Sequence, residues 1–329
     1  MSVMGTSRIG VPDTVRPVPA PRVRRGTAVP GARATELPAG PEAGEAPGTT
    51  GSGPVASVWL PSAPCSPEAC VAATEPTAAV PHAVLRLTAV LLLVVAGTVL
   101  LPVVRLLPAA PRERTIRAWC RAVVRVVGVK VRITGAAPRH GGLLMVANHI
   151  SWLDIPLLAA VRPGRMLAKT EIRQWPVAGA LTARSGALFI DRDRLRALPA
   201  TVARIADGLR AGSAVVVFPE GSTWCGRAQG YFRRAAFQAA LDADVPVQPV
   251  RLHYRYDGGP TSTAPAFVGS DSLLTSLWRV ASARRLVAEV RVTPVLTGET
   301  GTDRRALALA AQQALDLPHD PHPDHPAHP

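Results

Sequence analysis

Short apolar runs alternate with amphipathic stretches over the second half of the chain. The runs rich in Val, Leu and Ile predict strands at residues 129–133, 143–148, 186–191, 214–219, 245–252 and 286–295. Helices are expected near residues 155–161, 176–184, 196–211, 232–242 and 303–315. Strands that alternate with helices indicate an α/β domain, here residues 128–315, with a largely covered β-sheet flanked by helices.

A longer apolar segment precedes this domain. Eighteen residues between Arg86 and Arg105 carry no charge. As a helix they would span roughly 27 Å, close to the ~30 Å hydrocarbon core of a bilayer. A membrane-embedded helix is therefore predicted, with a buried core helix as the alternative. Gly97 and Pro102 could kink it, which leaves a re-entrant helix open.

The segment that follows has the pattern of a basic amphipathic helix. Arg114, Arg117, Arg121 and Arg125 recur at spacings of three and four and share one face. Apolar side chains lie on the opposite face, namely Ile116, Trp119, Cys120, Val123 and Val127. This favours a helix in an anionic membrane interface over one that only caps a core. The Arg excess places the following domain on the cytoplasmic side of the cell membrane, with residues 83–127 as the anchor.

Both ends of the chain have compositions typical of disorder. The first 50 residues hold eight Pro and seven Gly, and the first aromatic residue is Trp59. Residues 1–82 are therefore expected to be disordered, and so is the His- and Pro-rich tail 316–329. The tail could bind metal, but its alternating prolines favour a solvated segment.

Charge and cysteine content narrow the function only partly. Residues 83–315 carry 31 basic and 14 acidic side chains, a net charge of +17. Such a segment is suited to an anionic partner, whether a nucleic acid, an acidic membrane or a phosphorylated ligand. The cysteines Cys65, Cys70, Cys120 and Cys225 form no C-x-x-C pair and indicate neither a zinc site nor a disulfide scaffold. Free thiols are expected, although Cys65 and Cys70 could form a bridge outside the cytoplasm.

Candidate chemistry begins at the motif NHISWLDIP. His149 and Asp154 are five positions apart, so their side chains can meet only if the chain turns between them. With such a turn, Asp154 could hold one imidazole nitrogen while the other accepts a proton as a general base. The alternative is a loop histidine with Ser151 or Asp154 as a helix N-cap. The spacing alone is weak evidence, because His319 and Asp324 repeat it in the tail.

Two later strand ends carry further polar residues. In the motif GALFIDRDR a strand ends with Asp191 and Arg192, where ligands bind in open α/β sheets. In the motif AVVVFPEGST another strand ends in Pro219, Glu220 and Gly221. A turn at Gly221 could direct amides toward an anion, with Ser222 and Thr223 as further donors. The run VPVQPV follows, and its prolines suggest an edge or terminal strand.

Taken in order, these blocks resemble the family of 1-acylglycerol-3-phosphate acyltransferases, within the glycerolipid acyltransferase superfamily. The matching residues are Asn148, His149 and Asp154; Gly186 and Phe189 to Arg192; Phe218 to Gly221; and Val245, Pro246 and Pro249. Lys169, Glu171, Pro176 and Gly179 also look like the family. The resemblance implies a mixed α/β fold like that of glycerol-3-phosphate acyltransferase. It also implies acyl transfer from acyl-CoA or acyl carrier protein to a lysophospholipid hydroxyl.

The resemblance further implies roles for individual residues. His149 would be the base and Asp154 its orienting partner. The lipid acceptor would be held by Asn148, Arg192, Glu220, Gly221 and Ser222. No metal or bound cofactor is implied.

One departure affects the acceptor. Many lysophosphatidate enzymes of the family continue the third block with an Arg at the position of Thr223. Arg227, Arg233 or Arg234 could replace that Arg, or the acceptor head group could differ. Lysophosphatidic acid is the leading acceptor, since its phosphate suits a basic domain, and lyso-ornithine lipid or another lysolipid is the alternative. Two other classes remain, a basic nucleic-acid binder and a catalytically inactive membrane scaffold. The uncharged run disfavours the first, and the presence of both His149 and Asp154 disfavours the second.

Overall fold

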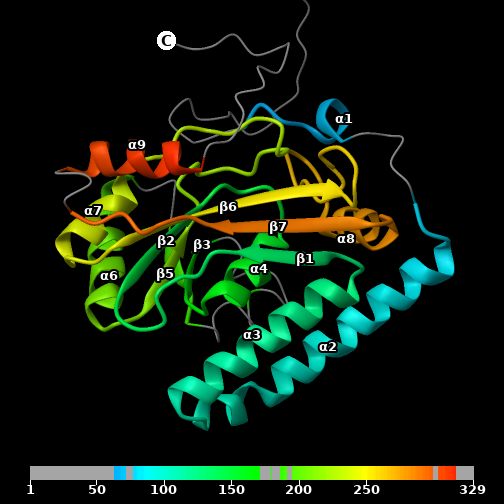
Figure 1. Cartoon of the computed structure of the whole chain (residues 1–329), viewed down its shortest axis with the longest axis horizontal. Helices are drawn as coiled ribbons and strands as arrows, with labels where there is room; N and C mark the ends of the chain where they lie inside the picture. Colours follow the sequence, from blue (N-terminus) through cyan, green and yellow to red (C-terminus); the bar gives the residue numbers. More distant parts are fainter. Residues whose placement is uncertain are drawn as a thin grey trace, which may run out of the picture. The chain divides into compact units, whose positions relative to one another are not determined.

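The computed structural model describes residues 63–71, 77–170, 179, 186–190, 195–298 and 303–315 (Figure 1). The tail 316–329, most of residues 1–82 and the expected helix at 176–184, apart from residue 179, lie outside the described part of the chain. So do Asp191 and Arg192.

A seven-stranded mixed sheet forms the centre of the domain, in the order β1-β7-β6-β2-β5-β3-β4. Its strands are β1 (Lys130–Thr134), β2 (Leu143–Ala147), β3 (Arg165–Lys169), β4 (Leu188–Ile190), β5 (Ala214–Val217), β6 (Val247–Tyr256) and β7 (Leu286–Val292). Only the β6–β7 pair is antiparallel; the other pairs run parallel. The predicted mixed α/β fold is confirmed.

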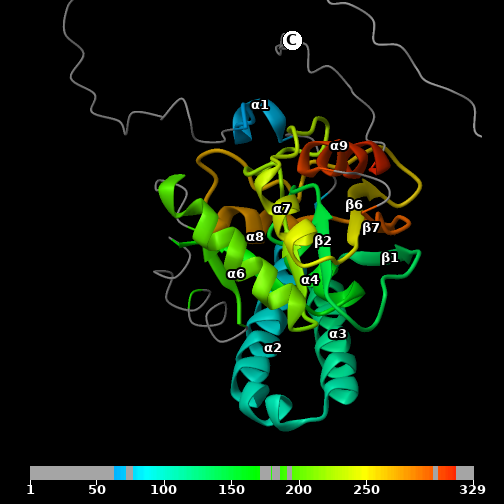
Figure 2. The same ribbon diagram turned by 90° about the vertical axis from the view of Figure 1, so that its left-hand side faces the viewer.

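Helices cover both faces of the sheet (Figure 2). The helices are α1 (Pro67–Cys70), α2 (Val80–Leu106), α3 (Ala109–Val126), α4 (Asp154–Val161), α6 (Leu198–Arg210), α7 (Ala235–Asp242), α8 (Leu273–Ser282) and α9 (Arg304–Ala314), with the short 3-10 turn η2 (Leu195–Ala197). Strand β2 shows the layering, because Leu143 and Met145 pack with α3, α4 and α8 while Leu144 and Val146 pack with α6, α7 and α9. A strand buried on both faces has no polar alternation, which explains the continuous apolar run at 143–147.

Three of the described elements were not predicted, namely α1, β3 and α8, and α1 lies in the segment 1–82 that was expected to be disordered. The prolines of β6 suggested an edge or end position; β6 is not an edge strand, because it lies between β7 and β2. Pro249 is tolerated there because it lies just beyond the last β6–β7 pair, Val250 with Val292, and its carbonyl still accepts the Thr293 N–H at 3.2 Å.

Helices α2 and α3 form an antiparallel hairpin that extends from the domain (Figures 1 and 2). The first turns of α2 are tied to the end of α8, since Arg86 donates to the carbonyls of Ala281 and Ala283 at 2.7 and 3.0 Å. Further along, Trp119 donates its indole N–H to Leu93 O at 3.1 Å, and the ring fills the space beside Gly97. Gly97 therefore serves close helix packing, and α2 runs unbroken through Pro102.

The outer surface of α2 in this hairpin is apolar. Of the described helices, α2 is the one long and apolar enough to cross a membrane. Its exposed large side chains are Val80, Val84, Leu85, Leu91, Leu92, Val95, Val99, Leu100, Val103 and Leu106. An apolar surface of this extent is characteristic of membrane contact.

Candidate active site

The chain turns sharply after β2 and brings His149 to Asp154. The His149 Nδ1 and Asp154 Oδ2 atoms are 2.8 Å apart. Asp154 begins α4, and its Oδ2 also accepts the N–H groups of Ile150 and Ser151 at 2.7 and 2.8 Å. The carboxyl group therefore closes the turn that the motif spacing required.

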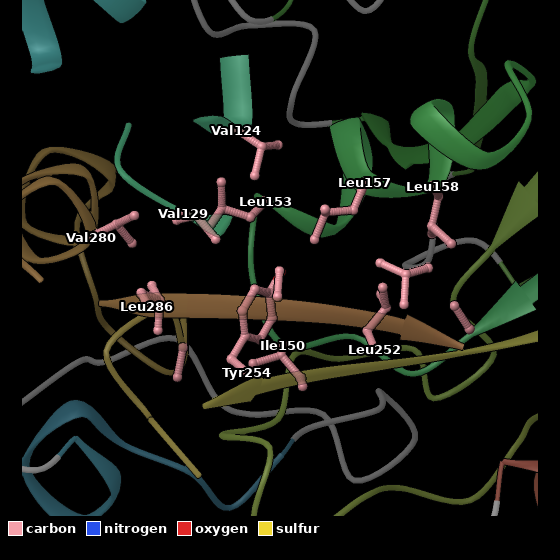
Figure 3. Packing of buried hydrophobic residues seen from close by; sticks show 14 of the residues in the cluster. Val124, Val129, Ile150, Leu153, Leu157, Leu158, Leu252, Tyr254, Val280 and Leu286 are labelled. Carbon is pink, nitrogen blue, oxygen red and sulfur yellow. The ribbon is translucent and has the colours of Figure 1, made fainter. Parts of the chain in front are cut away.

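Asp154 is fully buried and is held from the other side by Tyr254. The phenol Oη donates to Asp154 Oδ1 at 2.6 Å. Burial, with the neighbouring Asp154 charge, raises the pKa of Tyr254 well above its usual value, so the phenol keeps its proton and stays a donor. Figure 3 shows Tyr254 from β6 among the apolar side chains under α3, α4 and α8.

These contacts determine which ring nitrogen of His149 carries the proton. Asp154 receives donors from two amides and a phenol, so it acts as an acceptor toward Nδ1 as well. The Nδ1–H therefore donates to Asp154 and leaves Nε2 able to accept a proton. The His149 side chain is 23% exposed, which makes it accessible to a substrate.

The plane of the imidazole is set by the next strand. Phe218, at the end of β5, stacks on the His149 ring with centroids 3.9 Å apart and an interplanar angle of 14°. The backbone of His149 is held by the same loop, because the Trp224 N–H donates to His149 O at 2.8 Å. Ring and backbone are thus fixed independently of the Asp154 contact.

Glu220 supports the His149 backbone rather than reaching outward. Its Oε2 accepts the His149 N–H at 2.9 Å, and its Oε1 accepts the Gly230 N–H at 3.3 Å. Burial raises the pKa of Glu220 to about 8; the two N–H groups oppose that rise, and the Asp154 charge adds to it. A buried carboxyl group that binds backbone amides positions the loop. We refer to residues 148–154 together with Phe218, Glu220 and Tyr254 as the His149 corner.

Asn148 is also engaged within the protein. Its amide donates to Leu252 O at 2.9 Å and accepts the Leu252 N–H at 2.8 Å. The Asn148 side chain therefore forms, just beyond the end of β2, the two backbone hydrogen bonds that a neighbouring strand would form with β6. This geometry argues for positioning the His149 turn instead of contacting the acceptor.

The other predicted binding residues lie close by or outside the described residues. Gly221 adopts a left-handed conformation with φ +78°, and its N–H donates to Phe218 O at 3.2 Å. That amide closes the turn, and the expectation that the turn binds an anion stays a prediction. Ser222 is half-buried next to it. Arg192 remains a prediction.

Tyr254 is the residue of this site that the sequence did not indicate. It lies one hundred positions after Asp154 in a strand that reads as ordinary core, VQPVRLHYRY. Its only local signal is its place five residues beyond Pro249 in the last matched block.

The chain is similar to known acyltransferases. A family model described as Acyltransferase matches residues 128–253. The chain is 40% identical over 210 residues to a lyso-ornithine lipid O-acyltransferase of Pseudomonas aeruginosa, covering 63% of this chain and 78% of that protein. It is 34% identical over 197 residues to a 1-acyl-sn-glycerol-3-phosphate acyltransferase of Neisseria meningitidis, covering 60% of this chain and 77% of that protein.

A solved structure supports the fold. The 1-acyl-sn-glycerophosphate acyltransferase of Thermotoga maritima superposes with a TM-score of 0.55 at 18% identity, covering 72% of this chain and 93% of that one. With the sequence relatives, this agreement extends over the domain that holds the His149 corner. The chain is an enzyme that belongs to the acyltransferase family, among the 1-acylglycerol-3-phosphate acyltransferases and their lyso-ornithine lipid relatives.

Proposed function

We propose that the protein transfers a fatty acyl group from a thioester donor to a lysolipid hydroxyl, with His149 as the general base. The observation that carries the proposal is the 2.8 Å contact between His149 Nδ1 and Asp154, which leaves Nε2 to accept a proton at a partly exposed position. Nε2 takes the hydroxyl proton as the acceptor oxygen attacks the thioester carbonyl. The imidazolium, stabilised by Asp154, returns that proton to the departing thiolate.

The donor is proposed to be acyl-CoA or acyl carrier protein, used as a substrate. No metal ion or bound organic cofactor is required for the acyl transfer itself, since the proton moves between the acceptor, His149 and the thiolate. His149 is the proposed catalytic residue, Asp154 orients it, and Glu220 and Asn148 are assigned to positioning.

The acceptor follows from two separate observations, both of which favour a lyso-ornithine lipid. Thr223 stands where many lysophosphatidate enzymes have an Arg, and it offers a phosphate no cationic fork. The relative named for lyso-ornithine lipid is 40% identical, against 34% for the relative named for 1-acylglycerol-3-phosphate. Lysophosphatidic acid, the leading acceptor from the sequence, becomes the second candidate; it is still favoured by the net charge of +17 on residues 83–315.

We further propose that the α2–α3 hairpin lies in the cytoplasmic leaflet without crossing the membrane, with the exposed apolar face of α2 in the lipid. The start of α2 and the end of α3 both pack on the same domain, through Arg86 and through Val124. A hairpin with both ends on one side fits the re-entrant alternative better than a single crossing. The Arg residues of α3 would then meet anionic headgroups on the cytoplasmic face.

A substrate comparison tests the acceptor. Purified protein in detergent receives radiolabelled acyl-CoA or acyl carrier protein with lyso-ornithine lipid, lysophosphatidic acid or lysophosphatidylcholine, and kcat/KM is compared. A higher kcat/KM for lyso-ornithine lipid is expected. Preference for lysophosphatidic acid would reverse the ranking but keep the acyl-transfer mechanism, whereas no transfer to any lysolipid would contradict the mechanism.

A further inference from the structure

Three cysteines that are remote in sequence converge beside the His149 corner. Cys65 precedes α1, Cys70 ends it, and Cys225 lies in the loop after Glu220. All three side chains are buried, and their sulfur atoms lie within 4.8 Å of one another. Neither sequence spacing nor charge indicated this cluster, because 155 positions separate Cys70 from Cys225.

The spacing of the sulfurs suits a shared metal ion. A Zn–S bond is about 2.3 Å, so two sulfurs on one tetrahedral zinc are roughly 3.8 Å apart. Sulfurs already within 4.8 Å need to move by less than about 1 Å each to reach that geometry. Thiolate is also the ligand that zinc and other thiophilic ions prefer.

A disulfide explains the cluster less well. Each of the three cysteines is a free thiol in the structure. A disulfide would also use two sulfurs and leave the third buried beside them. In the cytoplasm, where we propose that the domain lies, thiols are kept reduced.

We propose that Cys65, Cys70 and Cys225 form a structural site for a thiophilic metal ion, expected to be Zn²⁺, which joins the segment before the membrane hairpin to the active-site loop. The three thiolates provide three ligands. Among the described residues no His, Asp or Glu joins them, so the fourth position is open to water or a small ligand. The site revises the expectation from sequence that the protein holds no metal.

The position of the site suggests what it stabilises. Trp224, next to Cys225, donates its N–H to His149 O at 2.8 Å, and Gly226 contacts Ile150. The segment Cys65–Pro67 packs on Gly269 in the loop before α8. A metal ion here would fix the loop that holds the His149 backbone, and its loss would loosen that loop without removing a reacting group.

Metal content and spectroscopy test the proposal. The full chain is purified in detergent under reducing, anaerobic conditions, supplied with Zn²⁺, desalted, and analysed by inductively coupled plasma mass spectrometry. One zinc ion per chain is expected in the wild type. Co²⁺ in its place should produce sulfur-to-cobalt charge-transfer absorption in the near ultraviolet.

Matched alanine variants identify the ligands. Cys65→Ala, Cys70→Ala and Cys225→Ala should lose the zinc and the cobalt absorption, while Cys120→Ala, which removes a buried thiol on α3, should keep both. If a ligand variant fails to fold, the rate of thiol alkylation in the folded wild type is measured in place of that variant. Three thiols should become reactive when a chelator is added, with Cys120 the least reactive. A wild type that retains less than stoichiometric zinc, or equal zinc in all four variants, or a disulfide within the trio by mass spectrometry, would overturn the site.

Discussion

The His149 corner and the α2–α3 hairpin distribute polar and apolar groups in opposite ways. In the corner, the carboxyl groups of Asp154 and Glu220 are buried, and each accepts hydrogen bonds from several donors. On the hairpin, apolar side chains such as Leu85 and Val99 are 67% and 70% exposed. Buried polar groups with complete partners fix one geometry, whereas exposed apolar groups require a non-aqueous neighbour.

This contrast suggests that acyl transfer depends on the His149 corner and membrane binding on the α2–α3 hairpin. A change in the corner should alter the rate of acyl transfer and leave membrane binding intact. A change on the hairpin should release the protein from lipid and leave the chemistry intact. Each prediction below tests one side of that division.

The largest effect is expected at the base itself. His149→Ala removes the group proposed to take the acceptor proton, so kcat should fall by about 10²–10⁴-fold. Vesicle binding should match the wild type, because the apolar face of α2 is unchanged, and circular dichroism checks that the variant is folded. His319→Ala, which breaks the same spacing in the tail, serves as the control and should be silent. A His149→Ala enzyme that retained roughly a tenth or more of the rate would refute the base role.

The hairpin should control membrane binding. Its contribution to the free energy of binding should be similar in size to the effect of His149→Ala on the activation free energy. Leu85, Leu92 and Val99 recur every seven residues on one face of α2 and are all more than 60% exposed. Burial of each in lipid is worth about 1.5–3 kcal/mol, so changing all three to Lys should weaken vesicle binding by about 10³-fold or more. Co-sedimentation with anionic vesicles measures this.

Two results distinguish membrane loss from unfolding. The triple variant should keep a near wild-type kcat on a detergent-dispersed acceptor. Leu309→Lys, at an exposed apolar site on α9 across the sheet, should bind vesicles normally. A triple variant that still co-sediments with vesicles would show that this face of α2 does not enter the membrane.

The two regions also differ in how far sequence alone could predict them. The hairpin follows from local pattern, since an uncharged run and an Arg-lined helix are visible within fifty residues. The central strands were predicted for the same reason, because burial on both faces leaves continuous apolar runs such as LLMVA. The mutual position of His149 and Asp154 could be predicted from a motif that demands a turn.

What the sequence missed depends on contacts between distant segments. Tyr254 and Cys225 acquire their roles only when the sheet brings them beside Asp154 and α1. The central place of β6 was missed because prolines normally mark an edge strand. Pro249 is accepted in a central strand because it lies past the end of the β6–β7 ladder. Strand β3, RMLAK, is short and half-buried, so it has little periodic signal.

The ionisation of Glu220 should make stability depend on pH. The folded-state pKa is about 8 and the model-peptide value is 4.5. Between these values the folded chain holds a proton that the unfolded chain has released, so the free energy of unfolding should decrease as pH rises through this window. Glu220→Gln removes this dependence and should be the more stable protein, by a few kcal/mol, above about pH 8.

Denaturant unfolding of both proteins in detergent from pH 5 to pH 9 measures the difference. Below about pH 5 Glu220→Gln should be somewhat less stable than the wild type, because its amide nitrogen cannot accept one of the two backbone N–H groups that the carboxyl group binds. Asp207→Asn, at an exposed carboxyl group on α6, provides the control and should run parallel to the wild type. Parallel curves for Glu220→Gln and the wild type would show that Glu220 is not held neutral by burial.

The smallest effect, and the sharpest test of the corner, concerns Tyr254. Tyr254→Phe removes one hydrogen bond to Asp154 and leaves Oδ1 buried without that donor. Such a loss costs about 1–3 kcal/mol, which corresponds to about ten- to a hundredfold in kcat if Asp154 then orients His149 less firmly. KM should change little, because Tyr254 is buried beneath the site and touches no substrate.

Coupling to Asp154 separates positioning from general support of the core. If Tyr254 acts through Asp154, then Tyr254→Phe should have almost no further effect on kcat in an Asp154→Asn background. Tyr231→Phe, at a 71% exposed phenol, should be silent in both backgrounds. Additive losses in the double variant would mean that Tyr254 affects the rate by some route other than Asp154. Tyr254 donates to Asp154 Oδ1, and His149 contacts Asp154 Oδ2. A non-additive result would therefore show that the whole carboxyl group is fixed as a unit. The His149 corner would then be rigid, in contrast to the hairpin, whose surface is adapted to lipid.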